Sequence, residues 1–154
     1  MIRRILIPVD GSAVSHDALS VAVQLAEALR AGTRIIYVLD LGPLYTTEAS
    51  GVDVSEVEKA MLQEGEDILE KAAETARQAG VPSETALVPI YDSHVSDAIV
   101  DDARRWRADL IALGTHGRHG ISRLILGSVA EAVARTSPIP VLLVRGAAND
   151  GSTE

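Results

Sequence analysis

The sequence predicts an α/β fold in a single domain, with an open parallel sheet covered by helices on both faces. Five short apolar runs are spaced along the 154 residues, and each has the continuous hydrophobic character of a strand that is buried on both sides. Helical patterns with a period near 3.6 residues separate these runs. Strands and helices that alternate in this order join through right-handed crossovers and form a parallel sheet.

The first strand is expected at Ile5 to Val9, with Asp10 at its carboxyl end. A helix follows, and either Asp10 or Ser12 can cap its first turn while the other faces a ligand. Gly32 is expected to end this helix. Its apolar stripe consists of Val14, Ala18, Val21, Ala22, Leu25 and Leu29. The second strand is expected at Arg34 to Leu39.

The segment from Leu41 to Val54 contains Gly, Pro, Thr and Ser without periodicity, so it is predicted to be a loop. A capping box that starts at Ser55 predicts a long helix from about Glu56 to Gln78. The remaining expected elements are a strand at Glu84 to Pro89, a helix capped by Asp92 or Ser93 and running to Trp106, a strand at Ala108 to Leu113, a helix at Ser128 to Thr136, and a strand at Val141 to Val144.

The stretch from Leu110 to Ser128 is the most informative one for function. An apolar strand leads into a loop with glycines at positions 114, 117 and 120, and Gly127-Ser128 opens the next helix. Glycines let backbone N–H groups approach a bulky anion, and a helix N-terminus adds unpaired N–H groups and a partial positive charge. This order of features predicts a phosphate-binding loop. An ordinary turn followed by a capping box of Ser128 and Glu131 is the alternative.

The spacing of these glycines resembles the motif of the universal stress protein family, in its ATP-binding branch. That motif is Gly, two residues, Gly, nine residues, then Gly-Ser, and Gly114, Gly117, Gly127 and Ser128 match it. The run from Ile5 to Ser12 is similar to the first strand of the family, and Ile139 to Val144 is similar to the last. The chain departs from the family at Tyr91-Asp92, where glycine is frequent, which affects the expected shape of that loop.

The resemblance implies a Rossmann-like strand order of 3-2-1-4-5, which leaves a crevice between the loops after the first and fourth strands. ATP, AMP or ADP, with Mg²⁺, is the implied ligand. Asp10 would anchor the sugar, and the backbone of Val38 would contact the adenine edge. The implied ligand-binding residues are Pro8, Val9, Asp10, Val38, Leu113, Gly114, Thr115, His116, Gly117, Arg118, His119, Gly120, Gly127, Ser128, Val129 and Ala130.

Composition limits the partners of the chain. A formal net charge of −8 argues against nucleic acid, and no apolar run approaches the length of a membrane span. Cysteine is absent, which fits a reducing cytoplasm. Lys59 and Lys71 are the two lysines, and neither follows a glycine loop. A lysine-containing phosphate loop is therefore excluded, and any phosphate must be held by backbone N–H groups, hydroxyls, arginine or a metal ion.

Three functions remain open from the sequence. The chain is interpreted first as an ATP-binding regulator that acts as a homodimer through Ile139 to Val144, and its role in the stress response is what the family resemblance implies. The alternatives are a slow ATP hydrolase or phosphoryl or adenylyl transferase, and a dimerising module that binds no nucleotide. No catalytic residue is assigned. His116 and His119 have a spacing that permits zinc, but without Cys or acidic partners this site is the weaker reading. The nucleotide-binding domain is expected at residues 1–146, with a flexible tail at 147–154.

Overall fold

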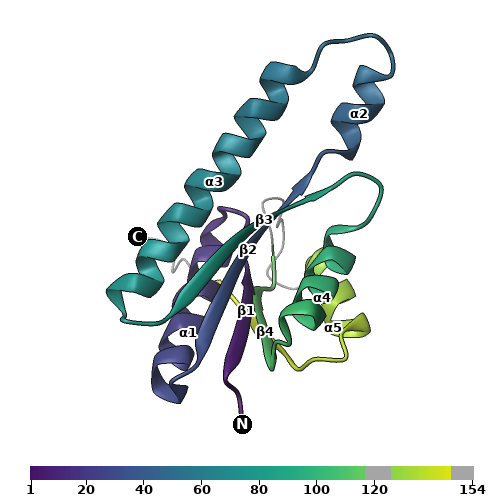
Figure 1. Cartoon of the computed structure of the whole chain (residues 1–154). Helices are drawn as coiled ribbons and strands as arrows, with labels where there is room; N and C mark the ends of the chain where they lie inside the picture. The colour runs from purple at the N-terminus through teal and green to yellow at the C-terminus, as the bar shows by residue number, and fades with distance from the viewer. Residues whose placement is uncertain (117–125, 147–154) are drawn as a thin grey trace, which may run out of the picture.

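The structure, a computed structural model, describes residues 1–116 and 126–146. Five parallel strands form one sheet in the order β3-β2-β1-β4-β5, which confirms the predicted topology (Figure 1). The strands are β1 (Arg4–Pro8), β2 (Gly32–Asp40), β3 (Ser83–Ile90), β4 (Leu110–Gly114) and β5 (Val141–Val144). The expected C-terminal tail lies outside the described residues.

Helices cover both faces of the sheet. Their bounds are α1 (Ala13–Leu29), α2 (Gly42–Glu48), α3 (Ser55–Gln78), α4 (Val95–Trp106) and α5 (Ser128–Thr136). One core joins the sheet to α1 and α3, and a second joins its other face to α4 and α5. In β1, Ile5 and Ile7 belong to the first core and Leu6 to the second, and all three are fully buried. The prediction of strands buried on both faces is therefore confirmed for β1.

The α2 helix corrects the prediction of a loop from Leu41 to Val54. Pro43 lies in the first turn of this helix, where its missing N–H costs no hydrogen bond. Leu41 is buried, and Leu44 packs against the core of α1 and α3. A seven-residue helix shows too little periodicity to stand out in a sequence that also contains Gly, Pro, Thr and Ser. The segment is therefore anchored by tertiary packing rather than by helix propensity.

Several predicted helix ends are wrong by a few residues. The α1 helix ends at Leu29, where Arg30 adopts a left-handed conformation with φ of 54°, and Gly32 begins β2 instead of ending the helix. Ser55 is the first residue of α3 and not its cap. His94, with no side-chain hydrogen bond, is the cap of α4 in place of Asp92 or Ser93. Ser12 does cap α1, because its hydroxyl accepts a hydrogen bond from the Ser15 N–H.

The predicted apolar stripe of α1 is confirmed in part, because Ala18 and Ala22 are buried and Leu25 packs against the core. Val21 and Leu29 are about 40% exposed, whereas Leu19, Val23 and Ala26 are buried. The helix contains Ala, Val and Leu on most of its circumference, so the 3.6-residue period fits more than one face. The sheet decides which face is buried, and this information is not contained in the helix alone.

The long α3 helix lies close to the sheet at Gly65. A Cβ at this position would lie 2.9 Å from the Tyr37 ring and 3.0 Å from a Leu87 methyl group, so only glycine allows this approach. The N-terminal half of α3 and the whole of α2 extend beyond the sheet and form an arm (Figure 1). Among the helices of the described residues, none combines the length and the apolar character that crossing a membrane requires.

Candidate functional site

The carboxyl ends of β1 and β4 are neighbours in the sheet, so the segments that follow them meet at one edge. On one side of β1, the Val9 N–H donates to the Ile36 carbonyl at 2.8 Å. On the other side lies Gly114, the last residue of β4. The crossovers on the two sides of this edge run in opposite directions, which is the arrangement that leaves a ligand-binding crevice in open α/β sheets.

The turn after β1 is held by a local network of hydrogen bonds. Asp10 Oδ1 accepts a hydrogen bond of 2.9 Å from the Ser12 N–H, and the Asp10 N–H donates to Ser15 Oγ at 3.1 Å. Ser15 is buried, so its hydroxyl ties the turn to α1. The sequence reasoning missed Ser15, whose only signal was a polar residue on the first turn of an apolar helix. Asp10 therefore shapes the turn, and its contact with a ligand stays a prediction.

Gly114 is required by the close approach of β4 to α1. A Cβ at this position would lie 2.7 Å from Val14 Cγ1 and 3.1 Å from the Val14 carbonyl oxygen. Val14 also lies against Gly146, where a Cβ would be 2.9 Å from Val14 Cγ2. From the sequence, Val14 was predicted to be one member of the apolar stripe of α1. In the structure its side chain lies between the segments that leave β4 and β5.

The two ends of the glycine-rich segment meet at Thr115 and Gly127. The Gly127 N–H donates to the Thr115 carbonyl at 2.7 Å, and a Cβ at Gly127 would lie 2.9 Å from the same oxygen. Eleven residues of the sequence separate these two positions. Thr115 is buried, and its N–H donates to the Val144 carbonyl at 2.9 Å. The start of α5 is thus fixed against the ends of β4 and β5.

Gly127 is the cap residue of α5, and it makes no side-chain cap hydrogen bond. The predicted capping box of Ser128 and Glu131 is therefore wrong, since Ser128 is already the first helical residue. The first N–H groups of a helix have no partner within it, so those of Ser128, Val129 and Ala130 are candidate donors at this end of α5. The Gly127 N–H is used by Thr115, which shifts the candidate donors one residue into the helix.

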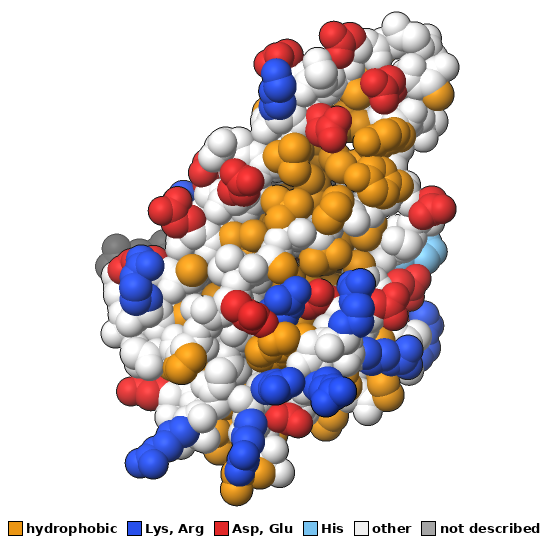
Figure 2. All heavy atoms as spheres, in the orientation of Figure 1, with side chains coloured by type: hydrophobic (Ala, Val, Ile, Leu, Met, Phe, Trp, Pro, Cys, Tyr) orange, Lys and Arg blue, Asp and Glu red, His pale blue; other side chains and the backbone are white. Residues whose placement is uncertain are grey.

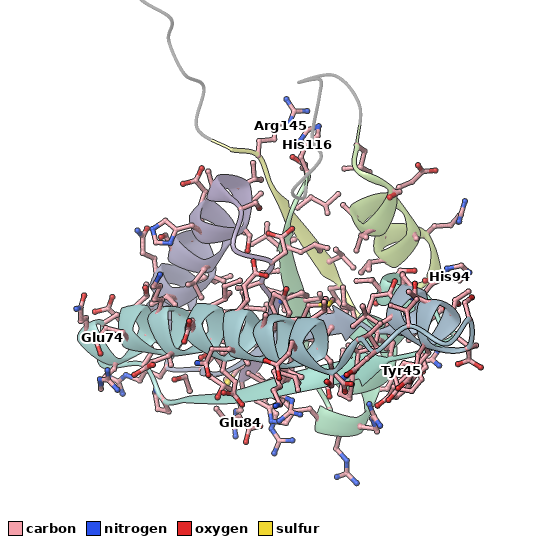
Figure 3. All side chains as sticks on the ribbon, turned by 90° about the horizontal axis from the view of Figure 1, so that it is seen from above. Tyr45, Glu74, Glu84, His94, His116 and Arg145 are labelled. Atoms are coloured by element: carbon pink, nitrogen blue, oxygen red, sulfur yellow. The ribbon has the colours of Figure 1, made fainter. Side chains whose placement is uncertain are left out.

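His116 follows Thr115 and carries an unusual buried atom. Its Nδ1 lies 2.9 Å from the Thr115 hydroxyl, while its buried Nε2 has no hydrogen-bond partner among the described residues. Figure 3 shows His116 and Arg145 at the edge where β4 and β5 end. The described part of the chain contains no group of three His, Asp or Glu side chains that could hold a metal ion. The predicted residues Gly117, Arg118, His119 and Gly120 lie outside the described residues.

The remaining predicted residues offer mainly backbone atoms to this edge. Val9 and Leu113 are buried and belong to the cores on opposite faces of the sheet. Pro8 and Val38 are half-buried, and Val38 pairs in register with Val88 of β3. An adenine ring at this edge would therefore lie on the ends of the strands, above side chains that already pack in the two cores.

An open cleft of about 950 Å³ lies beside the turn, between the start of α1 and the middle of α3. It includes Gly11 to Val14 on one side and Gln63, Glu64, Asp67 and Lys71 among the α3 residues on the other. The cleft adjoins the predicted crevice without containing the end of β4. Lys71 contributes to its lining, so one of the two lysines lies near the turn after β1.

Comparisons with known proteins support one family. A model of the universal stress protein family matches residues 1–145. A universal stress protein of Methanocaldococcus jannaschii is 35% identical over 143 residues, which are 93% of this chain and 82% of the relative. A solved structure of a family member from Burkholderia pseudomallei is 30% identical with a TM-score of 0.74, and covers 95% of this chain and 97% of that one.

A second similar solved structure contains a nucleotide. It is a universal stress protein in complex with cAMP, 29% identical with a TM-score of 0.67, and it covers 95% of this chain and 98% of that one. The strand order, the match along almost the entire chain and the sequence identities agree with one another. The chain belongs to the universal stress protein family.

Proposed function

We propose that the protein binds ATP at the edge formed by the ends of β1 and β4, and that it regulates a partner according to its nucleotide state. The hydrogen bond between Gly127 and Thr115 carries this proposal, because it brings the start of α5 to the end of β4. Gly114 and Gly127, two glycines of the motif, thereby lie at the same edge of the sheet. The relative that was solved with cAMP supports a nucleotide as the ligand.

The residues at this edge fit a phosphate chain. Gly114 and Gly127 lie where a Cβ would collide with neighbouring atoms, so these two glycines let the end of β4 and the start of α5 pack closely at this edge. The N–H groups of Ser128 and Val129 provide donors, and the helix N-terminus provides a partial positive charge. The buried Nε2 of His116 is a further group to which a ligand oxygen can bond. A Mg²⁺ ion bound with the nucleotide would neutralise part of the triphosphate charge.

Regulation is proposed in preference to catalysis. Asp10, the carboxylate at the end of β1, already accepts a hydrogen bond from the Ser12 N–H and shapes the turn. A carboxylate in this role positions a sugar more readily than it activates water. The proposal places the protein in the cytoplasm, with no nucleic acid as partner, in agreement with the lack of cysteine and the net charge of −8.

Protein purified without added ligand is expected to release ATP, ADP or AMP on denaturation, detected by mass spectrometry. Apo protein should bind Mg-ATP with a Kd of about 1–10 µM in calorimetry. Asp10→Ala is expected to weaken binding about tenfold, the value of one hydrogen bond to a charged group. Asp10→Asn keeps an acceptor for the Ser12 N–H and separates the loss of charge from the loss of the turn.

Asp101→Ala, an exposed substitution on α4, is the matched control and should bind ATP normally. Two results would favour the alternatives. Hydrolysis well above one turnover per minute that is lost in Asp10→Ala would indicate an enzyme. Absence of nucleotide together with no calorimetric signal for Mg-ATP would leave the dimerising module as the function.

We also propose a homodimer through β5. This strand is at the edge of the sheet, and all four of its residues are half-buried. An apolar edge without charge is a site for antiparallel pairing with a second copy. Sedimentation velocity at micromolar concentration is expected to give twice the mass of one chain. A monomer under these conditions would rule out the β5 dimer.

A further inference from the structure

An apolar surface is exposed on the arm, apart from the nucleotide edge. It consists of Tyr45 on α2, Val57 on α3 and Tyr91 after β3, which are 44%, 50% and 50% exposed. We call these three residues the arm patch. Figure 2 shows hydrophobic side chains gathered between α2, α3 and the edge of the sheet, with mostly acidic side chains on the side of the arm and both basic and acidic side chains below them. Figure 3 shows Tyr45 apart from His116.

The arm patch is held in place by packed contacts. The rings of Tyr45 and Tyr91 meet edge to face, with centroids 5.0 Å apart and planes at 85°. Below them, the Leu41 N–H donates to the Ile90 carbonyl at 2.8 Å, which ties the start of α2 to the end of β3. A Cβ at Gly42 would collide with the Tyr91 carbonyl oxygen. The two tyrosines are therefore fixed before any partner arrives, which lowers the entropic cost of binding.

The segment that forms the arm is strongly acidic. The segment from residue 40 to residue 66 contains seven Asp and Glu residues and a single basic residue, Lys59. Asp92 follows Tyr91 and adds a further carboxylate. The carboxylate of Glu58 acts on Tyr45 directly and raises the pKa of its phenol. A partner that covers the patch must therefore bring positive charge at its rim.

The edge of β3 does not favour an additional strand at this end. The carbonyls of Pro82 and Ile90 accept hydrogen bonds from the Thr33 and Leu41 N–H groups. The backbone N–H and carbonyl groups of the even-numbered residues of β3 therefore point toward β2. The backbone groups of the odd-numbered residues point away from the sheet, and one of these residues, Pro89, has no N–H to donate. Proline in this position blocks strand pairing beside the patch. A helix, which satisfies its own backbone, is the better occupant.

A second copy of the chain fits the patch poorly. A twofold contact would place the acidic rims of the two arms against each other, and like charges in close contact oppose association. We propose that the arm patch binds a basic amphipathic helix of a partner protein. Apolar side chains of that helix cover Tyr45, Val57 and Tyr91, while its Lys and Arg residues pair with the carboxylates around them. This surface serves the partner and is separate from the nucleotide edge.

A designed peptide tests the proposal directly. The probe is a fluorescently labelled 14-residue helix of Leu and Lys, measured by anisotropy at physiological ionic strength. Two control peptides replace Lys with Glu, or Leu with Ser at unchanged charge. The Leu/Lys peptide is expected to bind at least tenfold more tightly than either control, because both the apolar and the basic face contribute.

Variants of the protein locate the site of binding. Tyr45→Ser combined with Tyr91→Ser is expected to weaken the Leu/Lys peptide at least tenfold. Val57→Ser, which leaves the contact between the two rings intact, is expected to weaken it about threefold. Val21→Ser removes an exposed apolar side chain from α1 and should leave the affinity unchanged. Thermal melts of all variants show whether the fold is maintained. If the double variant has a clearly lower melting temperature than the original chain, the affinity of Val57→Ser decides the test.

Three outcomes would overturn the proposal. Equal binding of the Leu/Lys and Ser/Lys peptides would show attraction to net negative charge alone. Equal effects of Val57→Ser and Val21→Ser would place the binding elsewhere. Conversion of a dimer to a monomer by the tyrosine substitutions, seen in sedimentation, would identify the patch as an interface between copies. None of these results depends on whether ATP binds at the ends of β1 and β4.

Discussion

Gly127→Val is expected to reduce the affinity for Mg-ATP at least 100-fold while the sheet and the other helices remain folded. A Cβ at this position would lie 2.9 Å from the Thr115 carbonyl oxygen, so the start of α5 must move away from the end of β4. The hydrogen bond of 2.7 Å between these two residues would be lost with it. Two misplaced N–H donors to a charged ligand account for about 3 kcal/mol, which is about two orders of magnitude in Kd.

The control is a glycine at the opposite end of the sheet. Gly32 begins β2, and a Cβ there would meet its nearest neighbour, the Pro82 carbonyl oxygen, at 3.8 Å. Gly32→Val should therefore bind ATP with the affinity of the original chain. Calorimetry gives the two affinities, and circular dichroism with amide NMR spectra reports on the fold. Normal ATP binding by a folded Gly127→Val variant would show that the loop between β4 and α5 is not the phosphate site.

The strands could be predicted from the sequence because burial on both faces leaves a simple signature. Ile5 to Val9 and Val141 to Val144 are continuous apolar runs, and the structure places β1 and β5 there. The ends of the helices were harder to predict from the sequence. Gly32 is a residue that usually ends helices, yet α1 ends three residues earlier because Arg30 accepts a left-handed conformation. The local chemistry of a cap permits several positions, and packing selects one of them.

The position of the candidate site could be predicted where glycines in the sequence mark it. Gly114 and Gly127 lie where a Cβ would collide with its neighbours, so their spacing in the sequence records a steric need. The role of Val14 was not predictable, because a valine on an amphipathic helix looks the same whether it packs on the sheet or on Gly114. The arm patch was missed for a similar reason. Tyr45 and Tyr91 are 46 residues apart, and only the neighbouring ends of β2 and β3 bring them together.

Asp102→Ala is expected to lower the free energy of unfolding by about 2–3 kcal/mol, and the melting temperature by about 5–10 °C. Asp102 on α4 is almost fully buried, and it receives two hydrogen bonds from Arg34 of β2. The Arg34 Nε lies 2.7 Å from Asp102 Oδ2, and Nη2 lies 3.1 Å from Oδ1. This paired geometry raises the pKa of Arg34, mainly through the hydrogen bond to Asp102. The guanidinium stays charged when Asp102 is removed, because the ordinary pKa of arginine is already far above neutral. The expected loss is below that of a fully buried pair, because Glu84 still lies 3.3 Å from Arg34 Nη1.

Two further variants separate the value of the pair from the cost of an unpaired charge. Arg34→Met combined with Asp102→Leu should recover most of the stability, because apolar side chains of similar volume need no partner in the core. Lys59→Ala removes the exposed ion pair with Glu56 and should change the unfolding free energy by less than about 0.5 kcal/mol. Urea unfolding gives the free energy of unfolding of Asp102→Ala, of the double variant and of Lys59→Ala. If Asp102→Ala costs no more than Lys59→Ala, the pair does not hold α4 on the sheet. If the double variant has the same free energy of unfolding as Asp102→Ala, the two hydrogen bonds between Arg34 and Asp102 stabilise the packing of α4 on the sheet. The loss in Asp102→Ala would then not come from leaving the charge of Arg34 unpaired.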